Sequence, residues 1–347
     1  MVYGANGYTG GLIVAECLAR GIRPVLAARR AESIASLAAA HGLESRAFAL
    51  DEASAAERGV DGMRVVLHAA GPFFRTSAPM VSACFARGVH YLDITGEIAV
   101  FEACRARHDE ARRAGIVLLP GVGFDVVPTD CLAARLAERM PEASLLELAF
   151  AGGGGFSRGT LKTMVLGAGD GGAIRRDGRI ARVPAGWRRR PIPFRDKVRT
   201  GVTIPWGDVS TAHWSTRIPN IHTYIALPPG AARLAGATAL IAPFMAVPPV
   251  RRFVEKQIDR RVSGPSAEAR ATARMHIWGR VTHADGRTLD GTAETPEGYR
   301  LTAMAAVESA RRLLESPPPA GYHTPSTAFS SLFLETLPGC DVRLAGE

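Results

Sequence analysis

The stretch Gly4-Ala5-Asn6-Gly7-Tyr8-Thr9-Gly10 constrains the fold more than any other part of this chain. It follows Met1-Val2-Tyr3, which we interpret as the end of a strand, and it precedes the apolar helical pattern of residues 12–20. A strand, a glycine turn and a helix in this order are the context that a dinucleotide site requires. The alternative interpretation is an ordinary glycine-rich loop.

Each glycine of this turn has a separate predicted role. Gly4 permits the tight turn, Gly7 lets a pyrophosphate approach bare backbone, and Gly10 lets the helix lie close to the strand. The N-terminus of the helix then offers N–H groups and a partial positive charge to the phosphates. The predicted contacts from this turn are Gly4, Asn6, Gly7, Tyr8, Thr9 and Gly10.

The residues after the second strand predict which nucleotide binds. The apolar run of residues 24–28 ends where a site for NAD has an acidic residue on the ribose 2′-hydroxyl. Here the chain has Arg29 and Arg30, and a guanidinium suits a 2′-phosphate, so we predict NADP(H). The alternative for Arg29 is a solvated surface charge. Asp51, after the third strand, is predicted to accept from the adenine amino group or to cap a helix.

Alternation of short apolar runs with helical stretches predicts the fold class. This pattern continues to about residue 120, as in βαβ folds, and indicates an α/β Rossmann domain with a doubly wound parallel sheet over residues 1–122. A second, α+β domain on a mixed or antiparallel sheet is predicted for residues 123–322, with a hairpin around Asp285-Gly286. For residues 323–347 we predict a C-terminal helix, Thr327–Leu337, that packs back on the first domain.

Composition limits the remaining classes. The chain has 347 residues, is 47% hydrophobic, and carries five scattered cysteines without a C-x-x-C pair or clustered ligands, so we predict free thiols, no metal and a cytoplasmic location. No signal-peptide pattern opens the sequence. Because a first strand of three residues is short for a central parallel strand, we expect the natural chain to begin several residues upstream.

The net charge of +9 is concentrated in one segment. Residues 175–200 hold ten Lys or Arg and two Asp, a local charge of +8. The segment lacks a recognition-helix pattern, so we predict no nucleic-acid binding and instead a solvated loop or a cationic rim for an anionic substrate. The apolar segment Leu234–Val250 is interrupted by prolines and is too short to span a membrane. It is interpreted as a buried or homodimer-facing segment, a lid over an apolar substrate, or a peripheral membrane contact.

Several motifs in order resemble one known family, the saccharopine dehydrogenase-like oxidoreductases. The branch is the one that includes trans-acting enoyl reductases. The motifs are the glycine turn, Ala70-Gly71-Pro72-Phe73, His90-Tyr91-Leu92-Asp93-Ile94-Thr95-Gly96-Glu97, Gly121-Val122-Gly123-Phe124-Asp125 through Asp130, Ser157-Arg158-Gly159-Thr160, Ile277-Trp278-Gly279, residues 298–303 and residues 324–328. The resemblance covers nearly the whole chain.

This resemblance implies a Rossmann domain that binds NADP(H) and an α+β second domain, but it does not supply a substrate. The sequence departs from the family pattern at Asn6, where threonine is common, and at His68, where asparagine or a small residue is common. The chain is also short. Ala70, Gly71, Pro72 and Phe73 are expected along the cofactor near its nicotinamide half, although Phe73 could equally be plain core packing.

Hydride transfer needs orientation, dryness and a nearby acid. Candidates for the acid are Asp93, Glu97, Tyr91, His90 and His68. If Asp93 and Glu97 both face the cleft, one carboxyl pKa would rise. The alternative is that Asp93 caps a helix and Glu97 accepts from backbone N–H groups.

Asp125, Arg158 and Thr160 are the candidate substrate-binding residues, each with a structural alternative. Asp125 could orient a substrate or cap a helix, and Arg158 could bind an anion or be a surface charge. We therefore carry two hypotheses. The first is an NADP(H)-dependent reductase of a C=C or C=N bond in a small, anionic or lipid-like molecule. The second is a non-catalytic NADP(H)-binding or redox-sensing protein, because no Tyr-x-x-x-Lys motif is present.

Overall fold

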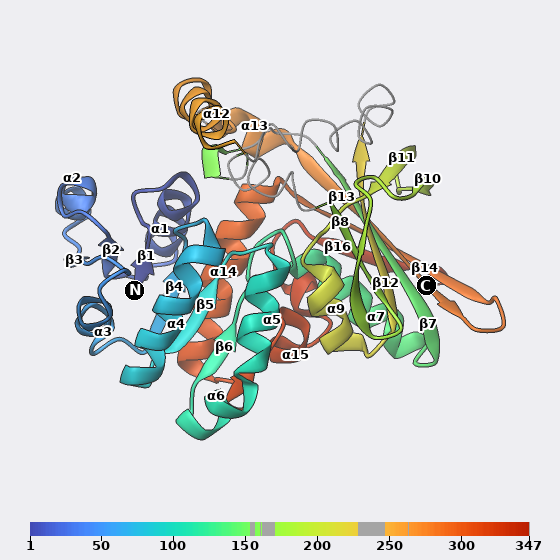
Figure 1. Ribbon diagram of the computed structural model, residues 1–347, viewed down its shortest axis with the longest axis horizontal. Coiled ribbons are helices and arrows are strands. Elements are labelled where there is room, and N and C mark those ends of the chain that lie inside the picture. Colours follow the sequence, from blue (N-terminus) through green and yellow to red (C-terminus); the bar gives the residue numbers. More distant parts are fainter. Residues whose placement is uncertain (153–156, 160, 162–170, 228–246, 263, 347) are drawn as a thin grey trace. The chain divides into compact units, whose positions relative to one another are not determined.

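The structure is a computed structural model that describes residues 1–347 except 153–156, 160, 162–170, 228–246, 263 and 347. The chain divides into two compact units (Figure 1). Unit 1 comprises Met1–Val127 and Tyr299–Ser330, and unit 2 comprises Pro128–Gly298 and Ser331–Glu347. The division differs from the predicted one because the chain returns to unit 1 at Tyr299.

Unit 1 is built on a seven-stranded parallel sheet in the order β15-β6-β5-β4-β1-β2-β3. The strands from β1 to β6 therefore follow the order 3-2-1-4-5-6 of the Rossmann fold. This order confirms the predicted fold class. The strands are β1 (Val2–Tyr3), β2 (Leu26–Ala28), β3 (Ser45–Ala47), β4 (Val65–His68), β5 (His90–Asp93), β6 (Val117–Leu119) and β15 (Gly321–Tyr322).

Helices cover this sheet, as Figure 1 shows for α1, α4, α5 and α14. Residues Ala303, Ala306, Val307 and Leu313 of α14 share a buried core with α1, α2 and the strands. A segment near the C-terminus thus completes the N-terminal core. The helices of unit 1 are α1 (Tyr8–Ala19), α2 (Glu32–His41), α3 (Ala53–Val60), α4 (Phe73–Arg87), α5 (Ile98–Ala106), α6 (His108–Ala114), α14 (Gly298–Glu315) and α15 (Pro325–Phe329).

Unit 2 contains a nine-stranded mixed sheet, which confirms the predicted second domain. Its main path is β10-β11-β12-β7-β13-β14-β16, with β8 pairing β12 and β9. Only the pair β12 and β7 is parallel among the described pairs of this sheet. The strands are β7 (Ala143–Gly152), β8 (Gly172–Arg176), β9 (Arg179–Val183), β10 (Arg189–Pro193), β11 (Val198–Thr203), β12 (Asn220–Leu227), β13 (Arg274–His283), β14 (Thr288–Pro296) and β16 (Asp341–Leu344).

One face of this sheet packs on helix α7 (Val127–Arg139). A Cβ added at Gly279 of β13 would lie 2.8 Å from a Leu136 methyl carbon, and one at Gly291 of β14 would lie 2.9 Å from a Leu132 methyl carbon. The glycines therefore let the helix sit flush against the hairpin of β13 and β14. The other described helical segments of this unit are α9 (Asp208–Thr216), α12 (Pro248–Arg261), α13 (Ala267–Thr272) and the 3₁₀ helix η2 (Phe333–Thr336).

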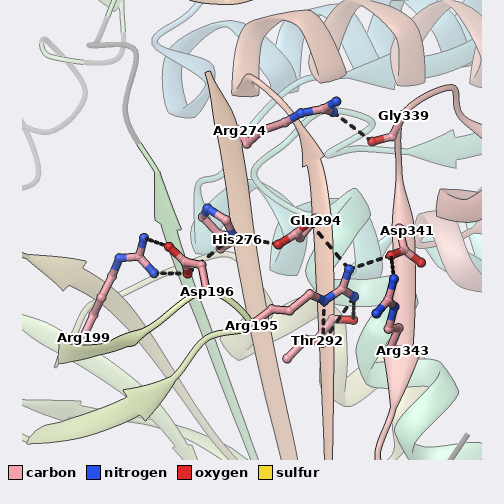
Figure 2. Close-up of polar contacts among 10 residues, drawn as sticks. All are labelled: Arg195, Asp196, Arg199, Arg274, His276, Thr292, Glu294, Gly339, Asp341 and Arg343. Carbon is pink, nitrogen blue, oxygen red and sulfur yellow. Dashed lines mark hydrogen bonds and ion pairs between the residues drawn. The ribbon is translucent and has the colours of Figure 1, made fainter. Parts of the chain in front are cut away.

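Ion pairs join the turn between β10 and β11 to strands β13, β14 and β16 (Figure 2). Arg195 Nη1 lies 2.6 Å from Asp341 Oδ2 and 3.6 Å from Glu294 Oε2. Arg199 holds both carboxylate oxygens of Asp196, and the pKa of Asp196 falls to about 2, chiefly because of that hydrogen bond. Because cations and carboxylates alternate here, the charges of this turn are largely balanced.

Two sequence expectations differ from the structure. The basic segment of residues 175–200 contributes to four antiparallel strands, β8 to β11, so its loop interpretation is wrong. Pairing of these strands with one another and with β12 gives their N–H and C=O groups partners. The predicted helix Thr327–Leu337 is instead α15 and η2, because the chain between them passes through Ser330 at a φ of 82°. The apolar residues 234–246 and the candidate site residue Thr160 lie outside the described residues.

Candidate functional site

The glycine turn between β1 and α1 has the geometry that its sequence predicts. Gly4 has a φ of +89°, and an added Cβ would lie 2.9 Å from backbone atoms of Ala69 and Ala70. An added Cβ at Gly10 would lie 2.1 Å from the Gly4 carbonyl oxygen. Only glycine fits either position, because real Cβ atoms do not approach so closely. The space between the turn and the first helical residues is therefore too small for a methyl group.

The exposed side of the turn is open at the N-terminus of α1. Asn6 and Gly7 are exposed, and Gly7 is the N-cap residue, without a side-chain cap hydrogen bond. The turn is held from below, where the Gly4 N–H donates to the Ala27 carbonyl at 2.7 Å. A rigid turn with exposed backbone at a helix N-terminus fits a pyrophosphate.

Arg29 and Arg30 follow β2 directly and are both exposed. Neither guanidinium forms a hydrogen bond or ion pair with a residue that the structure describes. Burial raises the pKa of Tyr3 to about 12, with Arg29 opposing the rise and Asp51 adding to it. Arg29 and Asp51, two of the predicted nucleotide contacts, thus lie close enough to the buried Tyr3 hydroxyl to influence its pKa. These positions fit the adenosine half of the cofactor at the carboxyl ends of β2 and β3.

The segment Ala70–Phe73 leads from β4 into α4. Its end is fixed by Glu97, whose carboxylate accepts from the Phe73 N–H at 2.9 Å and from the Phe74 N–H at 2.7 Å. These are orphan donors of the first turn of α4. The contacts support the structural alternative for Glu97, in which the carboxylate caps a helix that lies 24 residues earlier in the chain.

His68, at the end of β4, is completely buried among aromatic rings. Its ring centroid lies 5.4 Å from that of Tyr3, 5.4 Å from that of Phe73 and 6.1 Å from that of Tyr91. Burial lowers the pKa of His68 to about 4, and the contact of its Nε2 with the Ala70 carbonyl, at 3.0 Å, opposes this only in part. His68 is therefore neutral at pH 7 and packs beneath the Ala70–Phe73 segment.

Asp93, at the end of β5, is a buried carboxylate surrounded by donors. Its Oδ1 accepts from the Thr95 N–H at 3.0 Å and from the Gly121 N–H at 2.9 Å, and its Oδ2 accepts from the Tyr91 hydroxyl at 2.7 Å. Burial nevertheless raises its pKa to about 6. Asp93 thus ties the loop after β5 to the loop after β6, which favours its structural interpretation.

Asp125 lies against the loop that carries Gly96 and Glu97. A Cβ added at Gly96 would lie 2.7 Å from Asp125 Oδ2, so the carboxyl rests against the backbone of the loop after β5. Burial raises the pKa of Asp125 to about 7, and the negative charge of Glu97 adds to the rise. A carboxyl group whose pKa lies near neutrality suits a proton donor.

The start of α14 contributes residues to which the sequence analysis assigned no role. Tyr299 makes an edge-to-face contact with Tyr8, with ring centroids 5.1 Å apart, and the Thr302 hydroxyl accepts from the Phe124 N–H at 3.0 Å. These contacts connect the glycine turn with the loop that carries Asp125. Residues 298–303 belong to one of the motifs of the family resemblance, but the local sequence does not indicate which unit this segment joins.

The remaining predicted site residues are not brought together with these groups. The Arg158 Nε donates to the Val262 carbonyl within unit 2, and Thr160 lies outside the described residues. In the described part of the chain, no cluster of three or more His, Cys, Asp or Glu could hold a metal. Nor is any described helix both long enough and apolar enough to cross a membrane.

Comparisons with known proteins agree with this geometry. Residues 1–119 match the family model described as the saccharopine dehydrogenase NADP binding domain. A trans-acting enoyl reductase from Mycobacterium leprae is 33% identical over 160 residues, which is 43% of this chain and 37% of that protein. One from Mycobacterium tuberculosis is 32% identical over 160 residues, with the same coverage. The match thus spans well under half the length of either relative.

Among solved structures, the apo saccharopine dehydrogenase (L-Glu forming) from Saccharomyces cerevisiae has a TM-score of 0.65 at 10% identity. The match covers 99% of both chains, so it establishes a common fold. The family match and the geometry of the glycine turn agree on an NADP-binding domain. We conclude that this chain has the saccharopine dehydrogenase fold and that its residues 1–119 match the model of the saccharopine dehydrogenase NADP-binding domain.

Proposed function

We propose that this protein is an NADP(H)-dependent oxidoreductase that reduces a C=C or C=N bond of a small, anionic or lipid-like substrate. The observation that carries the proposal is the glycine turn, in which Gly4 and Gly10 leave no room for a Cβ and Gly7 exposes backbone at the start of α1. The names of the mycobacterial relatives support the C=C alternative.

The chain's own residues supply binding, orientation and a proton. When bound, NADPH supplies the hydride. The first turn of α1 would hold the pyrophosphate, and Arg29 would pair with the 2′-phosphate. Glu97 fixes the Ala70–Phe73 segment through the N-terminus of α4. Phe73 would then contact the nicotinamide half of the cofactor.

Asp125 donates the proton in this mechanism. Its raised pKa keeps a substantial fraction of the carboxyl protonated near pH 7. A catalytic role of Asp93 and Glu97 remains a prediction that substitution tests. Substrate contacts of Arg158 and Thr160 also stay predictions, as do a cytoplasmic location, a homodimer and peripheral membrane contact.

Single-turnover oxidation of bound NADPH tests the activity. The protein is mixed with one equivalent of NADPH and then with a panel of enoyl-thioesters, imines and keto acids. We expect oxidation, read as loss of absorbance of the reduced nicotinamide, with a member of the enoyl or imine classes. Tight binding of NADPH together with no oxidation by any member would instead support the redox-sensing alternative.

Replacing Arg29 by Asp tests the cofactor assignment. The variant should bind NADPH at least about tenfold more weakly and leave NADH affinity unchanged, because only NADPH carries the 2′-phosphate. Arg23→Asp is the control, since its guanidinium binds the carbonyls of His41 and Gly42. If the substitution Arg29→Asp left the affinities for NADPH and for NADH both unchanged, Arg29 would not bind the 2′-phosphate.

A further inference from the structure

The positive charges of residues 175–200 divide into two groups with different surroundings. At the turn between β10 and β11, Arg195 and Arg199 meet the carboxylates of Asp341 and Asp196 (Figure 2). Arg176, at the end of β8, and Arg188, just before β10, form no ion pair with any residue in the described part of the chain. Both are exposed. The charge excess of this segment is therefore local, and it is not cancelled where these two arginines lie.

These two guanidiniums gather on one aromatic ring. Cζ of Arg188 lies 4.4 Å from the centroid of Trp187, and Cζ of Arg176 lies 5.9 Å from it. The imidazole of His222 meets the same indole edge-on, with centroids 5.3 Å apart and planes at 75°. We call Trp187, Arg176, Arg188 and His222 the Trp187 cluster. Its members come from three separate segments, so tertiary structure assembles it.

His222 is the buried member of the cluster. Its exposed fraction is 7%, and its Nδ1 is buried without a hydrogen-bond partner in the described part of the chain. Burial lowers the pKa of His222 to about 4, with Arg188, Arg176 and Arg190 adding to the decrease and Glu147 opposing it. The ring is therefore neutral at pH 7 and carries one N–H that can be donated. A neutral imidazole beside two cations is a suitable hydrogen-bond donor to an anion.

The nearby acidic group does not neutralise the cluster. Glu147 of β7 is ion-paired with Arg190 and accepts from the Tyr224 hydroxyl at 2.8 Å. Its charge is thus matched by Arg190, and two cations, Arg176 and Arg188, remain unmatched. Because both guanidiniums lie against the same indole, their positive charges add there, and a bound anion would offset them.

We propose that the Trp187 cluster binds the phosphate group of a small phosphorylated metabolite. Two unmatched guanidiniums balance the two negative charges of a phosphate monoester, whereas a carboxylate would leave one cation unmatched. His222 supplies a neutral donor, and the indole of Trp187 offers a flat surface for the rest of the ligand. This site lies wholly within unit 2 and does not rest on the proposed reductase activity.

Histidine NMR of the full chain, saturated with NADP⁺, tests the proposal. NADP⁺ occupies the nucleotide site, so that added inorganic phosphate reports on the cluster. At constant ionic strength and pH 7, phosphate should shift the ring resonances of His222 saturably and raise its pKa, because the bound anion favours the imidazolium. Acetate at the same ionic strength should bind at least about tenfold more weakly.

Paired substitutions provide the matched control. The double variant Arg176→Gln/Arg188→Gln should weaken phosphate binding at least about tenfold. The control variant Arg179→Gln/Arg182→Gln removes the same charge from exposed positions of β9. Neither of these guanidiniums makes a cation–π contact with Trp187 in the described part of the chain, so the control should change affinity less than about twofold. All four residues are exposed, and unchanged circular dichroism confirms folding.

Three results would overturn the proposal. The first is the absence of a saturable shift of His222 with phosphate. The second is equal weakening by the two double variants, which would indicate diffuse electrostatic attraction. The third is equal affinity for acetate and phosphate, which would assign the cluster to carboxylates.

Discussion

At the scale of single residues, the glycine turn is determined by contacts that leave no space for a side chain. Gly4 and Gly10 face each other across the turn, and the close approach of Gly10 to the Gly4 carbonyl is what brings α1 onto β1. Gly11, one position later, has only the Ala5 carbonyl oxygen near its would-be Cβ, at 3.9 Å. Two adjacent helical glycines therefore differ sharply in what they tolerate.

The pair Gly10→Ala and Gly11→Ala tests this difference. We expect Gly10→Ala to lower the free energy of unfolding by about 1–3 kcal/mol, because the turn must move away from the helix, and to weaken NADPH binding. Gly11→Ala should be neutral or stabilising by about 0.5–1 kcal/mol, since alanine loses less backbone entropy in a helix. Urea unfolding and calorimetric titration with NADPH measure both. Similar behaviour of the two variants would contradict the packing argument.

Asp125 is the residue whose protonation should govern the rate. Its pKa of about 7 means that the acid form is lost as the pH rises through 7. If Asp125 donates the proton, kcat/KM should fall above that pH, and Asp125→Asn should lower kcat about 10²-fold or more without weakening NADPH. Asp109→Asn, with a carboxylate that is 77% exposed on α6, is the control. A pH profile that survives in Asp125→Asn would assign proton donation elsewhere.

At the scale of elements, α4 begins where a carboxylate from another loop meets its first N–H groups. Both carboxylate oxygens of Glu97 accept hydrogen bonds from that helix. Partial burial raises the pKa of Glu97, and the two N–H donors oppose this rise. The position of the Ala70–Phe73 segment thus depends on the loop after β5.

Substituting Glu97 separates capping from catalysis. Glu97→Gln should cost about 1 kcal/mol of unfolding free energy and Glu97→Ala about 2 kcal/mol, in proportion to the acceptors lost. Both should weaken NADPH binding, with the larger loss in the alanine variant. Glu57→Gln, on the surface of α3, should change neither quantity. Loss of turnover in Glu97→Gln at unchanged stability and cofactor affinity would restore a catalytic role.

At the scale of the whole molecule, the cofactor-binding unit is discontinuous in sequence. Strands β1 to β6 come from the first 127 residues, but α14 supplies Ala303, Ala306, Val307 and Leu313 to the same core. Cofactor binding at the glycine turn should therefore stabilise α14 together with the N-terminal strands. Unit 2 holds its own core around Trp278 and Tyr224.

Hydrogen exchange measures this coupling. With NADPH at about 100 times its Kd, the free energy of opening of unit 1 should rise by about 2.7 kcal/mol. We expect slower exchange in β1 to β6 and equally in α14, and little change in β10, β11 and β14. NADP⁺ provides a second ligand for the same comparison. If α14 exchanged like the strands of unit 2, the assignment of α14 to unit 1 would be wrong.

Much of the nucleotide site follows from sequence because its determinants are local. Gly4, Gly7 and Gly10 act over a single turn, and Arg29 follows directly on a strand, so spacing alone predicts their placement. The parallel sheet followed in the same way from the alternation of strands and helices. The hairpin around Gly286, with β13 paired to β14, was equally readable because both partners are adjacent in the chain.

What the sequence could not determine is which distant groups meet. Glu97 reaches a helix that begins 24 residues earlier, and the hydroxyl of Thr302 receives an N–H from Phe124, 178 residues away. The same holds for the basic segment, where pairing in the sheet gives some arginines a carboxylate and leaves others on Trp187. Neighbouring residues determine local backbone conformation, and it can therefore be predicted from the sequence. The partner of a charge or a polar group depends on the packing of distant segments, which only the folded chain brings together.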